Sequence, residues 1–251
     1  MDKLTDRQLE RYSRQLILPQ IDFLGQERLN LQSVLIVGAG GLGGPIAQYL
    51  TGAGVGKIRV VDPDLVELSN LHRQTVFGEE DIGRNKSECL AARLSAMNSD
   101  VTVEHYCEAF EISNSEDLLK GIVLVVDATD SRSARLKIDR ATFEHGLPWI
   151  MGAAVRTAGQ LCAFDSKRRH GCYHCLQDNI TGTETTGCAD TGILGPVVGI
   201  IALYQTVFAL KYLLGAEIPW GKLFYHDVWG GVHTKIKMTR VSDCVLCCEA
   251  N

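Results

Sequence analysis

The chain has 251 residues, 45% of them hydrophobic, and a formal net charge of −5. This length and composition suffice for one large α/β domain, or two small ones, with a full core. The acidic balance argues against a protein that binds nucleic acid by attraction to phosphate, so we expect no nucleic-acid partner. The polar, charged segment 1–15 does not resemble a signal peptide.

One apolar segment, 193–214, approaches the length that spans a membrane. It contains Pro196, Gln205 and Lys211, so we interpret it as a buried helix and expect no membrane partner. We expect a cytoplasmic protein, in which nine cysteines need a role other than disulfides.

The chain opens with two predicted helices, over 5–18 and 25–31. The first is amphipathic, and its charged face carries Arg7, Arg11 and Arg14. On their own these arginines are typical of a solvated face.

Residues 33–62 have the pattern of a nucleotide-binding unit. The predicted elements are a strand over 34–37, a glycine turn over 38–43 that includes Gly41, a helix over 45–53, a strand over 58–61, and Asp62. Glycines allow the backbone to approach a polyphosphate, and the helix N-terminus attracts that anion. Asp62 stands roughly 20 residues after the turn, where an acid binds a ribose hydroxyl. The alternative is a tight structural turn without a ligand.

Polar residues follow this unit. The loop 63–74 comes directly after a strand, so Asn70 and Arg73 are placed to reach a ligand on the glycine turn, although Arg73 alone is also typical of a surface. Lys86 lies in the first turn of a helix predicted over 83–97, where a cation opposes the helix dipole. Either a bound anion removes that objection or Lys86 is simply solvated.

Strands are predicted over 101–106 and 122–126, and the second ends at Asp127 and Asp130. Two carboxylates at the end of a strand suit a magnesium ion or a ribose. They also suit capping of the helix predicted over 131–144, and both uses can hold at once.

From Trp149 the regular alternation of strand and helix stops. Short strand candidates replace it, over 149–151, 160–164, 223–227 and 234–239. We therefore predict an α/β fold in which a Rossmann-like nucleotide-binding half with parallel strands continues into a mixed or antiparallel C-terminal half. One large sheet flanked by helices would form a single domain, with N-terminal helices over 1–32, the nucleotide-binding half over 33–148 and the second half over 149–251.

Two Cys-x-x-Cys pairs stand far apart, Cys172 with Cys175 and Cys244 with Cys247. Together they indicate a four-thiolate zinc site, and four protein ligands leave no position for water, so this zinc would be structural. A redox dithiol is the rival interpretation, and the neighbouring Cys248 complicates the ligand assignment.

Cys188 is the last residue of a polar stretch rich in glycine and threonine, 177–188, which we expect to be an exposed loop. It is either a nucleophile or inert.

With these pieces in place the chain resembles the MoeB/ThiF family of adenylyltransferases, which are similar to ubiquitin-activating enzymes. The resemblance runs nearly the whole length of the chain. Its motifs are Arg11-Tyr-Ser-Arg14-Gln15, the glycine turn 38–43, Ala53-Gly-Val-Gly56, Asp62-x-Asp64, Leu68-Ser-Asn-Leu-x-Arg-Gln74, Lys86, Asp127-x-x-Asp130, Gly152-Ala-Ala, Gly159-Gln160, the two cysteine pairs and Gly195-Pro-Val-Val-Gly199.

The resemblance implies attack of the C-terminal glycine carboxylate of a ubiquitin-like sulfur carrier, ending in Gly-Gly, on the α-phosphate of ATP. Such catalysis rests on positioning and cationic stabilisation. The implied residues are Asp62 for the ribose, the region of Gly41 with Asn70, Arg73 and Lys86 for the phosphates, and Asp130 for Mg²⁺.

The resemblance also implies a homodimer in which Arg14 reaches the ATP site of the partner subunit, which overrides the solvated-face interpretation. The family often has Asn where Ser131 stands, so one nucleotide contact is in doubt here. The chain ends at Asn251 without an appended sulfurtransferase domain, so we expect a separate sulfurtransferase. In the thiamine branch a cysteine matching Cys188 links covalently to the carrier, whereas in the molybdopterin branch it is dispensable; which rule applies here stays open.

Other functions are weighed against this one. An NAD-dependent oxidoreductase fits the glycine turn and Asp62 but does not explain Arg14, Arg73, Lys86 and Asp130 together. A non-catalytic scaffold would not need those cations and Asp130. A relative that adenylates another acceptor, such as a tRNA-modifying dehydratase or a peptide-adenylating enzyme, fits nearly as well as a carrier-activating one.

Overall fold

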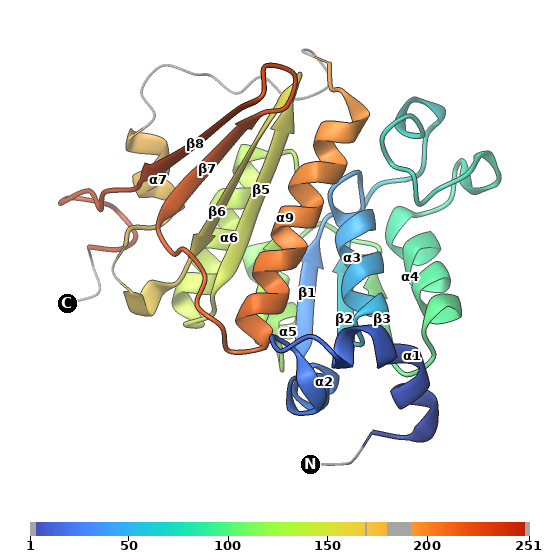
Figure 1. The fold of residues 1–251 in the computed structure, drawn as a ribbon. Coiled ribbons are helices and arrows are strands. Elements are labelled where there is room, and N and C mark those ends of the chain that lie inside the picture. The colour runs from blue at the N-terminus through green and yellow to red at the C-terminus, as the bar shows by residue number, and fades with distance from the viewer. Residues whose placement is uncertain (1–3, 169, 180–191, 249–251) are drawn as a thin grey trace.

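The computed structural model describes residues 4–168, 170–179 and 192–248 (Figure 1). In chain order its elements are α1 (Asp6–Leu16), α2 (Asp22–Asn30), β1 (Ser33–Val37), α3 (Gly43–Gly52), β2 (Lys57–Val61), η1 (Leu68–Asn70), η2 (Glu79–Asp81), α4 (Lys86–Met97), β3 (Thr102–Tyr106), α5 (Ile112–Leu119), β4 (Leu124–Asp127), α6 (Arg132–Glu144), β5 (Trp149–Val155), β6 (Ala158–Phe164), η3 (Ser166–Arg168), α7 (Tyr173–Asn179), α9 (Gly195–Leu213), β7 (Lys222–Asp227) and β8 (Val232–Lys237).

One eight-stranded sheet runs through both halves of the chain, in the order β3-β2-β1-β4-β5-β6-β7-β8. The strands from β3 to β5 pair in parallel, and those from β5 to β8 pair antiparallel. Val37 pairs with both Val61 and Asp127, so the carboxyl ends of β1, β2 and β4 lie side by side. The predicted fold class is confirmed.

Helices cover both faces of the sheet (Figure 1). Ile36, Val60 and Val126 point into the core beneath α3, α4 and α9, whereas Leu35 and Val125 point into the core beneath α5, α6 and α7. This alternation follows from the two-residue period of a strand, and both cores need it because both faces are covered.

The apolar helix α9 is the one helix of the described ranges that is long and apolar enough to cross a membrane by length and composition. It packs against α3 and against β5 and β6, with Ile201 and Ala202 wholly buried. The helix predicted over 193–214 therefore lies within the fold.

Local capping explains where the helices begin. The fourth helix starts at Lys86 rather than at Gly83, because the Asn85 side chain accepts hydrogen bonds from the backbone N–H groups of Ser87 and Glu88. Gly83 has a φ of +84°, which a helix cannot contain. The first helix begins after Thr5, which forms a reciprocal capping box with Gln8.

Candidate functional site

The glycine turn is dictated by close packing. Gly38 has a φ of +99°, in the region that favours glycine. A Cβ on Gly43 would lie 1.9 Å from the Gly38 carbonyl oxygen, and one on Gly41 would lie 2.7 Å from Val198 Cγ1 and 3.1 Å from the Arg73 carbonyl oxygen. The turn therefore packs closely between α9 and the loop that carries Arg73, and α3 begins at its last glycine, Gly43.

Asp62 joins the end of β2 to this turn. One carboxylate oxygen accepts a hydrogen bond from the Ala39 backbone N–H at 2.6 Å, and the other accepts one from the Asp64 N–H at 2.8 Å. Burial raises the pKa of Asp62, and the two backbone donors act against that rise. The acid therefore lies at the turn, where a ribose would be bound.

Lys86 is buried and paired, so the interpretation of a simply solvated lysine is wrong. Its side chain is 8% exposed, and its Nζ lies 3.0 Å from Oδ2 of Asp64, whose side chain is 63% exposed. The backbone N–H of Lys86 also donates to the Asp64 carbonyl oxygen at 2.9 Å. Lys86 is thereby held at the N-terminus of α4 by the Asp64 carboxylate, which is exposed to solvent.

The loop after β2 contains acceptors without partners. Asn70 Oδ1 and Gln74 Oε1 are buried, and neither has a hydrogen-bond partner among the described residues. Arg73 is half-buried, and its Nη1 donates to the Ser69 carbonyl oxygen and lies against His72 Nε2, each at 2.9 Å. Buried acceptors are normally satisfied, so this loop fits a ligand that supplies donors.

The two acids at the end of β4, its last residue Asp127 and the nearby Asp130, have different surroundings. Asp127 is wholly buried, and it accepts hydrogen bonds from Arg135 Nε at 3.0 Å and from the Thr129 N–H and hydroxyl at 2.9 and 2.6 Å. Burial raises the pKa of Asp127, and the Arg135 guanidinium opposes that rise. Asp130 is exposed. Only Asp130 of this pair is therefore accessible to a magnesium ion.

Neither acid caps the helix that follows, which corrects the expectation from sequence. Ser131 is the N-cap of α6, and its hydroxyl accepts from the Ala134 N–H at 3.4 Å.

These groups meet at what we call the nucleotide edge, the loops at the carboxyl ends of β1, β2 and β4. The turn and the acid loop touch, because the Ala128 N–H donates to the Val37 carbonyl oxygen at 2.8 Å and a Cβ on Gly38 would lie 2.8 Å from the Ala128 carbonyl oxygen. The predicted residues that the structure brings to this edge are Gly41, Asp62, Asn70, Arg73, Lys86 and Asp130.

Arg14 is not among them. It lies exposed in the last turn of α1, and its helix neighbour Arg11 donates to the carbonyl oxygen of Met97 at the C-terminal end of α4. Lys86 begins that 12-residue helix, so the two ends are about 18 Å apart. Cys188 lies outside the described residues.

The cysteine centre consists of Cys172, Cys175, Cys244 and Cys247. Their sulfurs lie within 4.8 Å of one another, and the residues are 0% to 8% exposed. The separations are 3.4 Å for Cys172 to Cys244 and for Cys175 to Cys247, and 3.9 Å for Cys172 to Cys175, far longer than a disulfide bond of about 2.05 Å. Four converging thiols form a ligand set for a tetrahedral metal ion.

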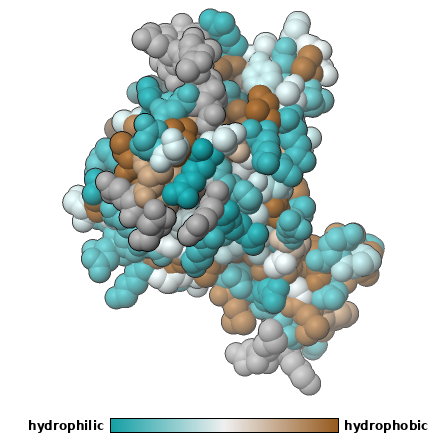
Figure 2. Space-filling model, turned by 90° about the vertical axis from the view of Figure 1, so that its left-hand side faces the viewer, coloured by the Kyte–Doolittle hydropathy of each residue, from teal (hydrophilic) through white to brown (hydrophobic). Residues whose placement is uncertain are grey.

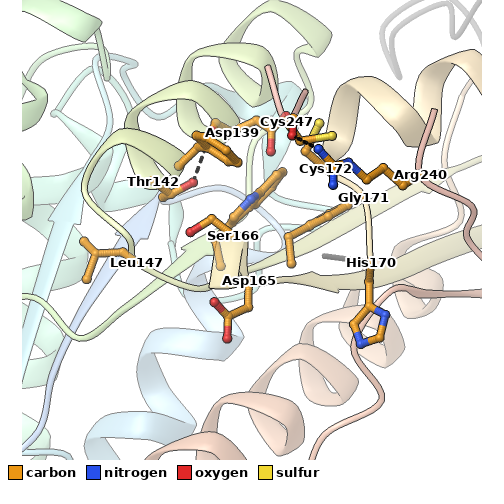
Figure 3. Close-up of a pocket in the computed structure, with 13 residues that line it drawn as sticks. Asp139, Thr142, Leu147, Asp165, Ser166, His170, Gly171, Cys172, Arg240 and Cys247 are labelled. Atoms are coloured by element: carbon orange, nitrogen blue, oxygen red, sulfur yellow. Dashed lines mark hydrogen bonds between the residues drawn. The ribbon is translucent and has the colours of Figure 1, made fainter. Parts of the chain in front are cut away.

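The surroundings of the centre favour these four cysteines over Cys248 as ligands. The Cys248 thiol points away and donates to the Ser242 carbonyl oxygen at 2.7 Å. The Val241 N–H donates to Cys175 Sγ at 3.4 Å, as backbone groups do around metal-bound sulfur. A hollow beside the centre is lined by Asp139 and Leu147 near the C-terminal part of α6 and by the backbone around Gly171 (Figure 3).

Sequence reasoning assigned no role to several residues that build the nucleotide edge. Asp64 and Gln74 stood in its motifs, and their spacing from Asp62 and Arg73 was the available signal. Arg135 and Gln205 had no such signal. Gln205 reaches the edge from α9 and donates to the Asp127 carbonyl oxygen at 2.7 Å, a contact between distant segments.

Comparison with known proteins adds to this geometry. The ThiF family profile matches residues 12–246. The chain is 39% identical to the sulfur carrier protein adenylyltransferase of Thermus thermophilus, over 97% of this chain and 92% of that protein. It is 37% identical to the sulfur carrier protein ThiS adenylyltransferase of Escherichia coli, over 99% and 98% of the two chains. It is 35% identical to the molybdopterin-synthase adenylyltransferase of Salmonella typhimurium, over 98% and 99%.

Among solved structures, Escherichia coli MccB with MccA-N7isoASN superposes with a TM-score of 0.80, over 96% of this chain and 74% of that one. Since the identity is 22%, this likeness shows the fold alone.

Proposed function

The chain belongs to the ThiF family, as its motifs indicate, and we propose that it adenylates the C-terminal glycine carboxylate of a ubiquitin-like sulfur carrier protein. The observation that carries the proposal is the nucleotide edge. A buried, paired lysine, a half-buried arginine and an exposed acid meet there on a glycine turn, beside acceptors that lack partners within the described residues.

The reaction needs two anions brought together. A carboxylate oxygen of the carrier bonds to the α-phosphorus of ATP, the bond from that phosphorus to the bridging oxygen breaks, and pyrophosphate leaves with its electrons. Lys86 and Arg73, with Asn70 beside them, surround the phosphates and stabilise the charge that develops there, and the Asp62 carboxylate accepts from the ribose hydroxyls. Asp130 would hold Mg²⁺, which neutralises phosphate charge when bound. No proton needs to leave the attacking carboxylate, so the residues act by position and charge.

The cysteine centre fits one structural zinc ion per chain. Its four thiols are soft ligands at tetrahedral spacing, and they leave no position for a water molecule or a substrate. The ion would join the segment of Cys172 and Cys175 to the segment of Cys244 and Cys247.

The proposal includes a homodimer in which Arg14 completes the partner's nucleotide edge. Arg14 is exposed and remote from the edge of its own chain. Large apolar side chains stand exposed beside it, with Ile17 at 75% and Leu24 at 67%, and hydrophobic surface gathers near the N-terminal end of the molecule (Figure 2). Such surface is typical of a subunit interface.

Subunit complementation tests this arrangement. Homodimers of Arg14→Ala and of Asp130→Ala should each be inactive, whereas mixed dimers should regain activity, because one of their two edges has both residues intact. Mixed dimers that stay inactive would place Arg14 at the edge of its own chain, and an active Arg14→Ala homodimer would place it outside the reaction.

The wider assignment follows from the same proposal. The chain acts as one domain over 1–251, with its nucleotide half over 33–148 and its carrier-binding and zinc half over 149–251. The carrier serves molybdopterin or thiamine-type sulfur transfer in the cytoplasm, where ATP and reduced thiols occur together. The sulfur comes from a separate sulfurtransferase, and Cys188 is the candidate for a covalent link to the carrier.

ATP–pyrophosphate exchange is the decisive experiment. The zinc-loaded protein is assayed alone and with each candidate carrier that ends in Gly-Gly, and a carrier lacking its last glycine is the control. We expect exchange with one carrier and none with its truncated form. Binding of ATP without exchange on any carrier would point to another acceptor, such as a peptide, and absence of ATP binding would refute the proposal.

A further inference from the structure

The segment between the first two cysteines is tied to α6. Asp139, which is 2% exposed, accepts hydrogen bonds through one carboxylate oxygen from the backbone N–H groups of Tyr173 and His174, at 3.0 and 3.3 Å. The same oxygen lies 2.9 Å from His174 Nδ1. Figure 3 shows Asp139 beside Cys172 and Cys247. The position of α6 and the position of the cysteine centre are therefore coupled directly.

One turn before Asp139, on the same face of α6, Arg135 holds the loop that leads to Asp130. Its Nη2 donates to the Thr129 carbonyl oxygen at 2.7 Å and to the Gly152 carbonyl oxygen at 3.3 Å, and its Nε donates to Asp127. Arg135 is 7% exposed. The residue bonded most closely, Thr129, immediately precedes Asp130.

Tyr173 connects the two ends of this arrangement. Its ring lies edge-on to Trp149 and Phe164, with centroids 6.0 and 6.4 Å apart, and its hydroxyl accepts from Gln177 Nε2 at 2.8 Å. The hydroxyl also interacts electrostatically with the Arg135 guanidinium. Burial raises the pKa of Tyr173 and Arg135 opposes the rise. A residue of the cysteine segment is thus bonded to α6 through its backbone and interacts with the arginine that positions the Asp130 loop.

We propose that Tyr173 and Asp139 are positioning residues, through which the metal-loaded cysteine centre holds Arg135 and thereby aims Asp130 at the magnesium ion of the bound nucleotide. The inference rests on the proposed adenylation. Its physical basis is that Arg135 has several donors in a rigid fork, so each fixed partner restricts the orientation of the rest. Small displacements of a group that binds a reacting ligand cost much activity.

This arrangement makes a prediction that a purely structural tyrosine does not. If Tyr173 acts through Arg135 on Asp130, its hydroxyl should affect binding of the magnesium complex of the nucleotide and leave binding of the magnesium-free nucleotide unchanged. A tyrosine that only stabilises the fold would alter both, or neither.

The test is Tyr173→Phe in the zinc-loaded full chain, which keeps the ring against Trp149 and Phe164. Tyr212→Phe is the control, because Tyr212 is half-buried and, like Tyr173, lies edge-on to an aromatic residue, Trp220 at 5.9 Å, but on the other face of the sheet. Calorimetric Kd values are measured for a non-hydrolysable ATP analogue with and without Mg²⁺. The loss of one hydrogen bond predicts a roughly two- to tenfold weaker Kd with Mg²⁺ in Tyr173→Phe alone.

A second arm links the effect to the metal. Chelating the zinc from the wild-type chain should weaken binding of the magnesium complex, and chelating it from Tyr173→Phe should weaken it less, because the connection is already cut. Asp139→Asn keeps an acceptor oxygen but loses the charge that pairs with His174 and strengthens the bonds to the backbone N–H groups, so it should weaken binding of the magnesium complex in the same direction, and it serves if Tyr173→Phe does not fold.

Three results would overturn the proposal. They are an unchanged Kd with Mg²⁺ in zinc-loaded Tyr173→Phe, an equal loss with and without Mg²⁺, and an equal loss in Tyr212→Phe. Because calorimetry needs no carrier, a wild-type chain that binds the magnesium complex but shows no exchange would contradict the adenylation proposal without deciding this one.

Discussion

The nucleotide edge and the cysteine centre both contact α6, through Arg135 and Asp139, and hold their polar groups in opposite ways. At the edge, Asp130 is exposed, and Asn70 and Gln74 keep acceptors that no described group satisfies. At the centre, four sulfurs converge within 4.8 Å, and all are buried. An open region with unpaired acceptors suits a substrate that enters and leaves, whereas a closed, complete ligand set suits an ion that stays. Variants at the two regions should therefore change different quantities.

The largest effect is expected from Asp130→Ala. This variant removes the exposed carboxylate that would hold magnesium and should lower exchange by roughly 10²- to 10³-fold, with little change in melting temperature because the side chain is not packed. Exchange activity and calorimetric Tm are measured together. Asp117→Ala, an exposed acid on α5, is the control and should keep full activity. Normal turnover of Asp130→Ala would remove Asp130 from the metal-binding role.

The cations of the edge should come next. Arg73→Ala and Lys86→Ala should each lower kcat by roughly tenfold to a hundredfold, because each removes a positive charge beside the developing pyrophosphate. Lys57→Ala is the control, since Lys57 also pairs with a carboxylate, that of Glu104, at 2.8 Å but lies at the start of β2. A loss of only twofold in either edge variant would show that the cation does not act on the phosphates.

The sequence predicted the parallel half of the fold well because its signals are local. Apolar runs, the glycine turn and Asp62 lie within one short stretch, and strand order follows from how such units pair. The predicted bounds of helices and strands were less accurate where the hydrophobic pattern is weak. The short strand predicted over 149–151 extends to Val155, and α5 was not predicted at all.

The two acids at the end of β4 show where local reasoning fails in the site. The residue pattern did not distinguish them, and only the family resemblance assigned Asp130 to magnesium; they differ because Arg135, from the following helix, buries and neutralises Asp127 alone. The cysteine centre was predictable despite the distance between its pairs, since a tetrahedral site requires four ligands and the spacing within each pair is specific. The link through Tyr173 and Asp139 was not, because neither residue belongs to a pattern.

Removal of zinc should change stability more than chemistry. Loss of the ion leaves four buried thiols without their common ligand, so we expect a Tm lower by several degrees in the chelated protein. Calorimetry before and after chelation, with zinc content measured in parallel, checks this. Cys248→Ser should keep both zinc and Tm, because the Cys248 thiol bonds to a backbone carbonyl outside the centre. A chelated protein that melts unchanged would refute a structural zinc.

The smallest effect is expected from Ser131→Asn, which separates capping from nucleotide contact at one position. Serine and asparagine are comparable N-caps, so the free energy of unfolding should change by less than about 0.5 kcal/mol. Asparagine is longer and carries an amide. If the position faces the nucleotide, the KM for ATP should fall by roughly two- to threefold, which corresponds to the free energy of one weak hydrogen bond. Ser131→Ala, measured beside it, should lose about 1 kcal/mol of stability because α6 then lacks its cap. An unchanged KM in Ser131→Asn with the expected loss in Ser131→Ala would show that position 131 serves the helix alone, and that the edge ends at Asp130.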